Sequence, residues 1–152
     1  MKIDKLFKGL TRIANGDYVL EGDLVVEGDL IIELDDRFVV KGKIKVEKSI
    51  KAGCGIKAGC GIEAGWGIEA GEGIKAGWGI EAGTFIHSEK RIFAGLYICH
   101  TSGNCKKHIK CAELRKGEIC YGDLIIEEPV VEITIAEIEA KLGIKNLKIR
   151  EE

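Results

Sequence analysis

The sequence has very little proline, few aromatic residues and no long apolar run. Its 152 residues include a single proline, Pro129, and aromatic residues make up 6% of the chain. Because no stretch of about 18 consecutive apolar residues occurs, we expect no transmembrane helix and no membrane contact. Residues 1–15 lack the apolar core of about 7–15 residues that a secretory signal needs. We therefore expect a cytoplasmic protein.

An excess of charge of either sign is also missing. The chain has 23 Lys and Arg against 25 Asp and Glu, which gives a net charge of −2. Because a strong basic patch is what attracts phosphates, we expect no direct binding to nucleic acid. The length suits one domain with a real hydrophobic core.

Glycine, in contrast, is abundant at 21 residues, and much of it lies in a six-residue repeat over residues 50–83. Each unit reads Ile, then Lys or Glu, then Ala, Gly, any residue and Gly. Two apolar residues separated by one charged residue form a period-2 pattern, which predicts a very short strand with the charge outward. Flanking glycines suit corners that need a positive φ or a close approach of the backbone. The repeated positions are Ile50, Ile56, Ile62, Ile68, Ile74 and Ile80, with Ala52, Ala58, Ala64, Ala70, Ala76 and Ala82.

A short fixed period predicts an all-β fold, a single-stranded β-solenoid over residues 16–127. Residues 28–33 read Gly-Asp-Leu-Ile-Ile-Glu, and residues 122–127 repeat them letter for letter. The phase slips by two residues at Leu34 and Asp35, where we expect a bulged corner. It breaks again at an irregular insertion near residues 101–107.

The period alone permits a two-sided coil of about 12 residues or a three-sided coil of about 18. Twelve residues would place Trp66 against Trp78, whereas eighteen would stack the like charges Lys57 and Lys75, which is unfavourable. Large Ile, Leu and Val side chains fill a triangle better than a thin sandwich, so we predict a triangular coil of about 18 residues.

Both ends of the solenoid need covering, because an open coil exposes unpaired strand groups. Residues 1–15 are predicted to form an amphipathic turn or short helix with Asp4 as its cap and an apolar side. That side comprises Leu6, Phe7, Leu10 and Ile13. Residues 128–152 are predicted to form a C-terminal cap. A capping box of Thr134 and Glu137 begins a helix at about residues 134–142.

Two groups of residues are candidate sites. Exposed tryptophans often mark binding surfaces, so Trp66 and Trp78, with Glu72 between them, are predicted to bind a partner protein. An alternative is that each tryptophan shields nearby backbone. The second group has spacing typical of a structural zinc site, the one cofactor that the sequence suggests. Its members are Cys99, Cys105, His108 and Cys111. Buried cysteine as an ordinary apolar residue is the alternative.

Cys54 and Cys60 occupy equivalent positions one repeat apart, so they should lie on different edges of the solenoid. That separation is too large for a disulfide, which needs Cα atoms roughly 4.4–6.8 Å apart. Free thiols agree with a cytoplasmic protein.

The alternating Gly-x-Leu/Ile-x-Val/Ala units of residues 16–127 resemble the bactofilin-like, polymer-forming solenoids, and the Gly-Ile-Glu-Ala-Gly array resembles small solenoid proteins of phages and mobile elements. The first resemblance implies filament formation. The second implies an inhibitor of host machinery, such as a nucleic-acid-targeting defence system, in a bacterium or a phage-infected host cell. Hexapeptide acyltransferases share the six-residue repeat, and there His87 is the candidate base.

No nucleophile–base pair stands out, and the glycines are periodic corners with no phosphate-binding motif. We therefore predict a non-enzymatic protein that binds a protein partner and forms a homodimer. A structural polymer module and an acyltransferase are the alternatives.

Overall fold

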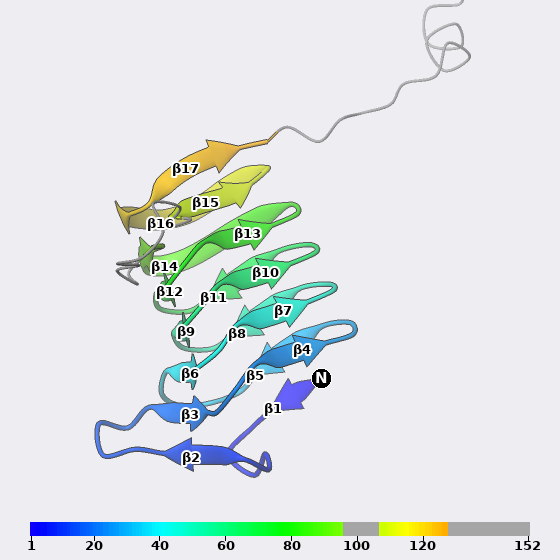
Figure 1. Ribbon diagram of the computed structural model, residues 1–152, viewed down its shortest axis with the longest axis vertical. Coiled ribbons are helices and arrows are strands. Elements are labelled where there is room, and N and C mark those ends of the chain that lie inside the picture. The colour runs from blue at the N-terminus through cyan, green and yellow to red at the C-terminus, as the bar shows by residue number, and fades with distance from the viewer. Residues whose placement is uncertain (96–106, 128–152) are drawn as a thin grey trace, which may run out of the picture.

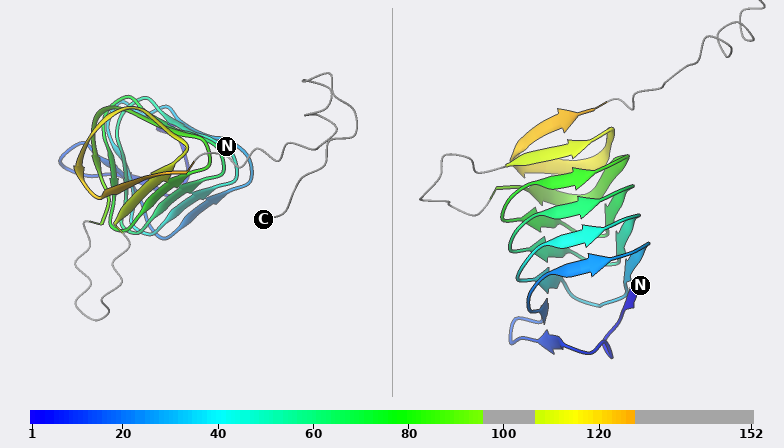
Figure 2. Two further views of the ribbon diagram at one scale, coloured as in Figure 1. Left: turned by 90° about the horizontal axis from the view of Figure 1, so that it is seen from above. Right: turned by 45° about the vertical axis from the view of Figure 1, so that its right-hand side comes forward.

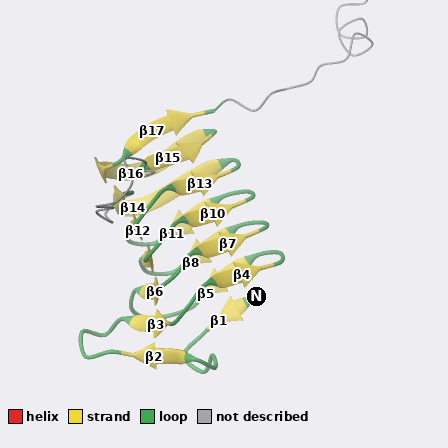
Figure 3. Cartoon of the chain, in the orientation of Figure 1, coloured by secondary structure: helices red, strands yellow, loops and turns green. Residues whose placement is uncertain are grey.

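The computed structural model describes residues 1–95 and 107–127, and these residues form a β-solenoid without any helix (Figure 3). The chain climbs through about 5 turns of about 18 residues each. All but one of the described strands stack in parallel above one another along the axis (Figure 1). Seen along that axis, the coils superpose in a three-cornered outline (Figure 2).

Each turn contributes one short strand to each of three faces. The first face stacks β4 (Leu24–Val26), β7 (Ile44–Val46), β10 (Ile62–Ala64), β13 (Ile80–Ala82), β15 (His108–Cys111) and β17 (Asp123–Ile126). The second face stacks β1 (Lys2–Ile3), β5 (Leu30–Ile32), β8 (Ile50–Ala52) and β11 (Ile68–Ala70). The third face stacks β2 (Leu10–Arg12), β3 (Tyr18–Leu20), β6 (Phe38–Val40), β9 (Ile56–Ala58) and β12 (Ile74–Ala76).

Two longer strands join the second and third faces near the C-terminal end. β14 (Phe85–Phe93) pairs with β11 and then with β12, and β16 (Glu113–Tyr121) pairs with β14 above it. The second and third faces therefore form one 11-stranded sheet, while the first face is a separate sheet of 6 strands.

The strand register confirms the three-sided prediction. Ile62 of β10 lies opposite Ile44 of β7 below it and Ile80 of β13 above it, each 18 positions away in the chain. A 12-residue coil would instead have paired Ile62 with Ile50. The turn that contains Leu34 and Asp35 takes 20 residues, from Leu30 to Ile50 for example, because the predicted irregularity there adds two.

The core is a stack of aliphatic rungs, as the period-2 pattern predicts. Through the glycine-rich repeat, each isoleucine and each alanine points inward and is buried, and the charged residue between them faces outward. Phe38 is completely buried and fills an early rung. Burial of this aliphatic column supplies the main driving force for stacking, because short three-residue strands have few local contacts of their own.

In residues 53–83, no glycine has a positive φ, so backbone conformation does not explain why glycine is needed there. The remaining reason is the space between neighbouring turns. A Cβ atom on Gly65 would lie 2.0 Å from the carbonyl oxygen of Glu47 in the turn below. On Gly61, in contrast, a Cβ atom would meet the nearest backbone oxygen at 3.4 Å, an ordinary contact. The same 2.0 Å contact with a backbone oxygen arises at Gly71 and Gly83, which also follow a strand, whereas Gly53 would meet its nearest oxygen at 3.9 Å.

The N-terminal segment closes the first turn with strands, and no helix forms there. β1 pairs with β5, β2 pairs with β3 in antiparallel orientation, and Ile3 is completely buried. Asp4 does cap a turn, since its carboxylate accepts a hydrogen bond from the Leu6 amide at 2.9 Å. The expected apolar side is only half right. Phe7 and Leu10 pack against the core, whereas Leu6 and Ile13 are exposed.

The bulged corner holds this N-terminal segment by charge. Asp35 accepts hydrogen bonds from Lys5 and from the Tyr18 hydroxyl, each at 2.8 Å, and Arg12 pairs with Asp36 at 2.9 Å. The two extra residues of this turn thus include a carboxylate that ties the N-terminal segment to the solenoid. Most of the insertion predicted near residues 101–107, and the cap at 128–152 with its helix at 134–142, lie outside the described residues.

Candidate functional site

The three residues predicted to bind a partner lie at three different corners of the triangle. The Trp66 amide donates to the Lys48 carbonyl at 3.1 Å, in the corner between the first and second faces. Glu72 lies between the second and third faces, and its carbonyl accepts from the Lys90 amide at 2.9 Å. Trp78 lies between the third and first faces, where its amide donates to Cys60 at 3.2 Å. The three therefore cannot form one continuous patch.

Both tryptophans are exposed, at 57% for Trp66 and 47% for Trp78. Trp66 has a local partner, because the Lys48 ammonium lies 5.7 Å from the centre of its ring, a cation–π distance. Trp78 instead lines a groove of about 530 Å³. These observations single out Trp78, whose exposed indole borders a hollow surface.

The groove at Trp78, which we call the lysine groove, runs across successive turns at the corner between the third and first faces. Its lining includes small residues that pack closely between turns, and a Cβ atom on Gly59 would lie 1.9 Å from the Lys41 carbonyl oxygen. The lining also includes charged side chains and the aromatic ring of Trp78. The lining residues are Lys41, Lys57, Ala58, Gly59, Cys60, Lys75, Ala76, Gly77 and Trp78.

The lysine groove carries uncompensated positive charge. Lys57 of β9 and Lys75 of β12 lie directly opposite each other on neighbouring strands. Like charges in this position repel and destabilise a sheet. Within residues 1–95 and 107–127, neither of these lysines nor Lys41 forms an ion pair. Lys75 does lie 4.9 Å from the ring centre of Phe93, which faces outward on the next strand.

On the first and second faces, stacked residues of opposite charge form ion pairs. On the first face, Lys45 lies 3.4 Å from Glu63, and on the second, Lys51 lies 3.4 Å from Glu69. Glu81 follows Glu63 in the same column, but it hydrogen-bonds the Nε2 atom of His108 at 2.6 Å. Stacked charges are thus paired on these two faces, which makes the lysine pair on the third face unusual within this molecule.

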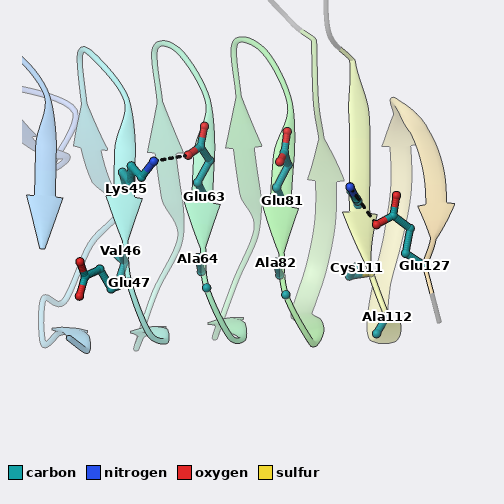
Figure 4. Close-up of a pocket in the computed structure, with 13 residues that line it drawn as sticks. Lys45, Val46, Glu47, Glu63, Ala64, Glu81, Ala82, Cys111, Ala112 and Glu127 are labelled. Atoms are coloured by element: carbon teal, nitrogen blue, oxygen red, sulfur yellow. Dashed lines mark ion pairs between the residues drawn. The ribbon is translucent and has the colours of Figure 1, made fainter. Parts of the chain in front are cut away.

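A second groove, on the first face, illustrates this pairing (Figure 4). It has a volume of about 540 Å³ and crosses the small residues that follow each strand. Lys45 reaches Glu63, and Lys110 reaches Glu127 at 2.8 Å, which raises the pKa of Lys110 through the hydrogen bond to that carboxylate. The charges along this groove therefore largely satisfy one another.

A third groove, of about 680 Å³, lies beside Glu72 at the corner between the second and third faces. Apart from Lys75, its charges are also paired, with Lys90 at 2.6 Å from Glu72 and Arg91 at 3.6 Å from Glu118. Lys75 lines this groove as well as the lysine groove. Lys75 of the third face thus borders both the lysine groove and this third groove.

The described part of the predicted zinc site does not converge. His108 and Cys111 belong to the same strand, β15, where burial alternates. His108 is on the outer side and bonds Glu81, whereas Cys111 is buried in the core, and that burial raises the pKa of its thiol. Cys99 and Cys105 lie outside the described residues. Among the residues that are described, no group of three or more Cys, His, Asp or Glu side chains is arranged to hold a metal ion.

His87, the base in the acyltransferase interpretation, lies on the outer surface of β14. Its Nε2 atom is 2.8 Å from Glu89, whose carboxylate also binds Lys116. These partners lower the pKa of Glu89, chiefly through the hydrogen bond from Lys116. His87 is therefore part of a surface ion network.

The lysines of the groove were missed as a site by the sequence analysis, although it contained the signal. An 18-residue coil predicts that Lys57 stacks on Lys75, and that prediction is confirmed. The repulsion between these two lysines is unfavourable for the sheet, and it lies beside the exposed side chain of Trp78.

Over residues 1–95 and 107–127, the fold and its surface define a three-sided β-solenoid with a basic groove whose lysines form no ion pair. Comparison of the chain with protein-family models, with curated proteins and with solved structures gives no match. Over the described residues, no helix is long and apolar enough to cross a membrane.

Proposed function

We propose that the protein is a non-enzymatic β-solenoid that binds an acidic segment of a partner protein in the lysine groove. The observation that carries the proposal is the stacking of Lys57 on Lys75, with no ion-pair partner for either among the described residues. A carboxylate placed between them relieves their repulsion and gains two charge-assisted contacts. Trp78 adds an apolar surface of the kind that anchors protein interfaces.

Rigidity supports this role. The three-residue strands are paired with the turns above and below, so the backbone positions that carry the lysines are fixed before the partner arrives. A preorganised surface loses little conformational entropy on binding. Attraction between the basic groove and an acidic segment also speeds association, and salt weakens it.

The test uses a fluorescent signal from the groove itself. The chain contains two tryptophans, so the variant Trp66→Phe leaves Trp78 as the sole reporter. In this background we would titrate a synthetic peptide of alternating Glu and Leu residues, with an equally long Lys and Leu peptide as the control probe. We expect the Trp78 emission to change only with the acidic peptide, and the affinity to fall as salt is raised.

A matched pair of charge reversals makes the test specific. Lys57→Glu creates an opposite-charge pair with Lys75, so it should stabilise the fold by about 0.2–1 kcal/mol while weakening peptide binding about tenfold or more. Lys51→Glu makes the same charge change on the second face but breaks the pair with Glu69, so it should cost stability and leave binding intact. Equal losses of binding in both variants, or no binding of the acidic peptide at all, would refute the proposal.

The family resemblance supplies a more particular form of the proposal, in which a phage or mobile element encodes the protein and the partner is host machinery that binding inhibits. Co-expression with a defence system, comparing the wild type with Lys57→Glu, tests this form. Loss of protection by the variant alone would support it.

A bactofilin-like structural polymer is the second candidate, and one observation favours it. The last described strand, β17, has an exposed apolar row at the C-terminal end of the solenoid, as an end-to-end contact requires. Light scattering coupled to size exclusion over a concentration series distinguishes the two functions. Length-heterogeneous assemblies would favour the polymer, and one sharp species would favour the binding protein.

A further inference from the structure

Four outward side chains of the third face lie in one column, which we call the third-face stripe. The strand register stacks them on β9, β12, β14 and β16, with two cations followed by two aromatic residues. The stripe comprises Lys57, Lys75, Phe93 and Tyr121. Below Lys57 the same column continues with Val39, which is 8% exposed. The stripe therefore begins at Lys57, where the column becomes accessible.

Charge distinguishes the third-face stripe from the matching columns on the other two faces. The first face stacks Lys45 beneath Glu63, and the second face stacks Lys51 beneath Glu69, so the cations there have carboxylate neighbours. Over residues 1–95 and 107–127, no member of the third-face column is a carboxylate. The column itself thus supplies nothing that neutralises its two lysines.

The aromatic half of the stripe adjoins the basic half. The Lys75 ammonium lies 4.9 Å from the centre of the Phe93 ring. Tyr121 lies opposite Phe93 on the next strand and is 48% exposed. Because the face of an aromatic ring is electron-rich, it attracts a cation and disfavours a carboxylate in the same place. The basic half therefore suits carboxylates, and the aromatic half suits apolar groups.

The size of the stripe fits a short extended peptide. Neighbouring strands lie about 4.8 Å apart, so the four side chains span about 14 Å, which an extended chain covers in about four to five residues. We propose that the stripe reads the order of residues in the partner segment, with carboxylates over the two lysines followed by apolar side chains over Phe93 and Tyr121. The segment then runs along the solenoid axis. This inference rests on the proposed function and adds the order of residues that the partner must have.

A single-stranded nucleic acid also combines negative charge with flat rings, but it fits the stripe less well. Proteins that bind such strands track the phosphate backbone with a continuous basic groove. The stripe offers two cations, and the net charge of the chain is −2. The observations therefore favour a peptide, whose carboxylates can be as few as the lysines that they meet.

Two fluorescein-labelled peptides of the same composition test whether the order is read. The block peptide has three Glu residues followed by three Leu residues, and the other peptide alternates Glu and Leu. Because alternate side chains of an extended chain face the same way, the alternating peptide presents one kind of residue to the stripe, whereas the block peptide presents both. Fluorescence anisotropy with the full chain should show that the block peptide binds about fivefold tighter or more. Equal affinities for the two peptides would overturn the proposal.

A pair of matched variants locates the apolar contact. Tyr121→Ser should weaken the block peptide about fivefold and leave the alternating peptide unchanged. Val25→Ser removes a side chain that is 62% exposed on the first face, so it should change neither affinity.

The outcomes also separate this proposal from the proposed function. If Tyr121→Ser has no effect while Lys57→Glu weakens both peptides, the reading of order is wrong and the proposed function stands. If neither peptide binds, both are wrong. Tighter binding of a labelled oligothymidine than of the block peptide, lost in Tyr121→Ser, would assign the stripe to nucleic acid and also refute the proposal.

Discussion

The glycines that flank one strand provide a sharp test of the stacking, because they differ in environment. Gly61 precedes β10 and Gly65 follows it, and neither has a positive φ. Alanine is therefore acceptable to the backbone at both positions, and only space distinguishes them. A Cβ atom on Gly65 would lie 2.0 Å from the Glu47 oxygen, against 3.4 Å for Gly61 and the Gly79 oxygen.

The cost of Gly65→Ala follows from this geometry. Relief of a 2.0 Å contact requires the two turns to separate by more than about 1 Å locally. The Gly65 amide bonds Val46 at 3.0 Å and the Trp66 amide bonds Lys48 at 3.1 Å, so that movement breaks both hydrogen bonds. With about 1 kcal/mol for each bond and a similar cost for overpacking, we expect a loss of about 3 kcal/mol.

Thermal and urea denaturation measure this difference. A loss of about 3 kcal/mol lowers the melting temperature by roughly 6–12 °C for a chain of this size. Gly61→Ala should instead be neutral or stabilise by up to about 1 kcal/mol, because alanine restricts the unfolded chain. Similar melting temperatures for the two variants would refute the close-approach explanation of the glycine repeat.

Two further predictions concern ionisation and thiol access. Hydrogen bonds from Lys5 and then Tyr18 hold the pKa of Asp35 at about 2, below the unfolded value of about 3.9. The ionised group therefore stabilises the fold above pH 4, and this contribution disappears as the pH falls through about 2. The difference in melting temperature between the wild type and Asp35→Asn should shrink from pH 5 to pH 2, and a constant difference would contradict the assignment. Iodoacetamide should label the exposed Cys120 in the folded protein and the buried Cys111, whose thiol pKa is raised by burial, only after unfolding. Peptide mass mapping that finds equal rates would show that Cys111 is accessible.

The strands, their inward and outward sides and the corners could all be predicted from the sequence pattern. These features are local: a strand such as β10 is specified by the alternation of Ile62, Glu63 and Ala64, and the repeat carries that alternation through the chain. The bulge at Leu34 was visible for the same reason, as a two-residue slip in an otherwise regular phase. At the N-terminus the sequence was less informative, because Leu6 and Ile13 had the spacing of an apolar helix side while pairing with β3 and β5 favoured strands.

Which outward residues become neighbours depends on the number of residues per turn, and the three-dimensional fold sets that number. A six-residue period divides both 12 and 18, so the sequence alone is compatible with either coil, and the choice depends on how side chains fill the interior. The 18-residue coil places Trp66 and Trp78 at different corners of the triangle and stacks Lys57 on Lys75. Burial, too, depends on neighbouring turns. Leu124 is exposed and Leu30 is buried although they hold the same position in identical hexapeptides, because Leu30 has a described strand above it.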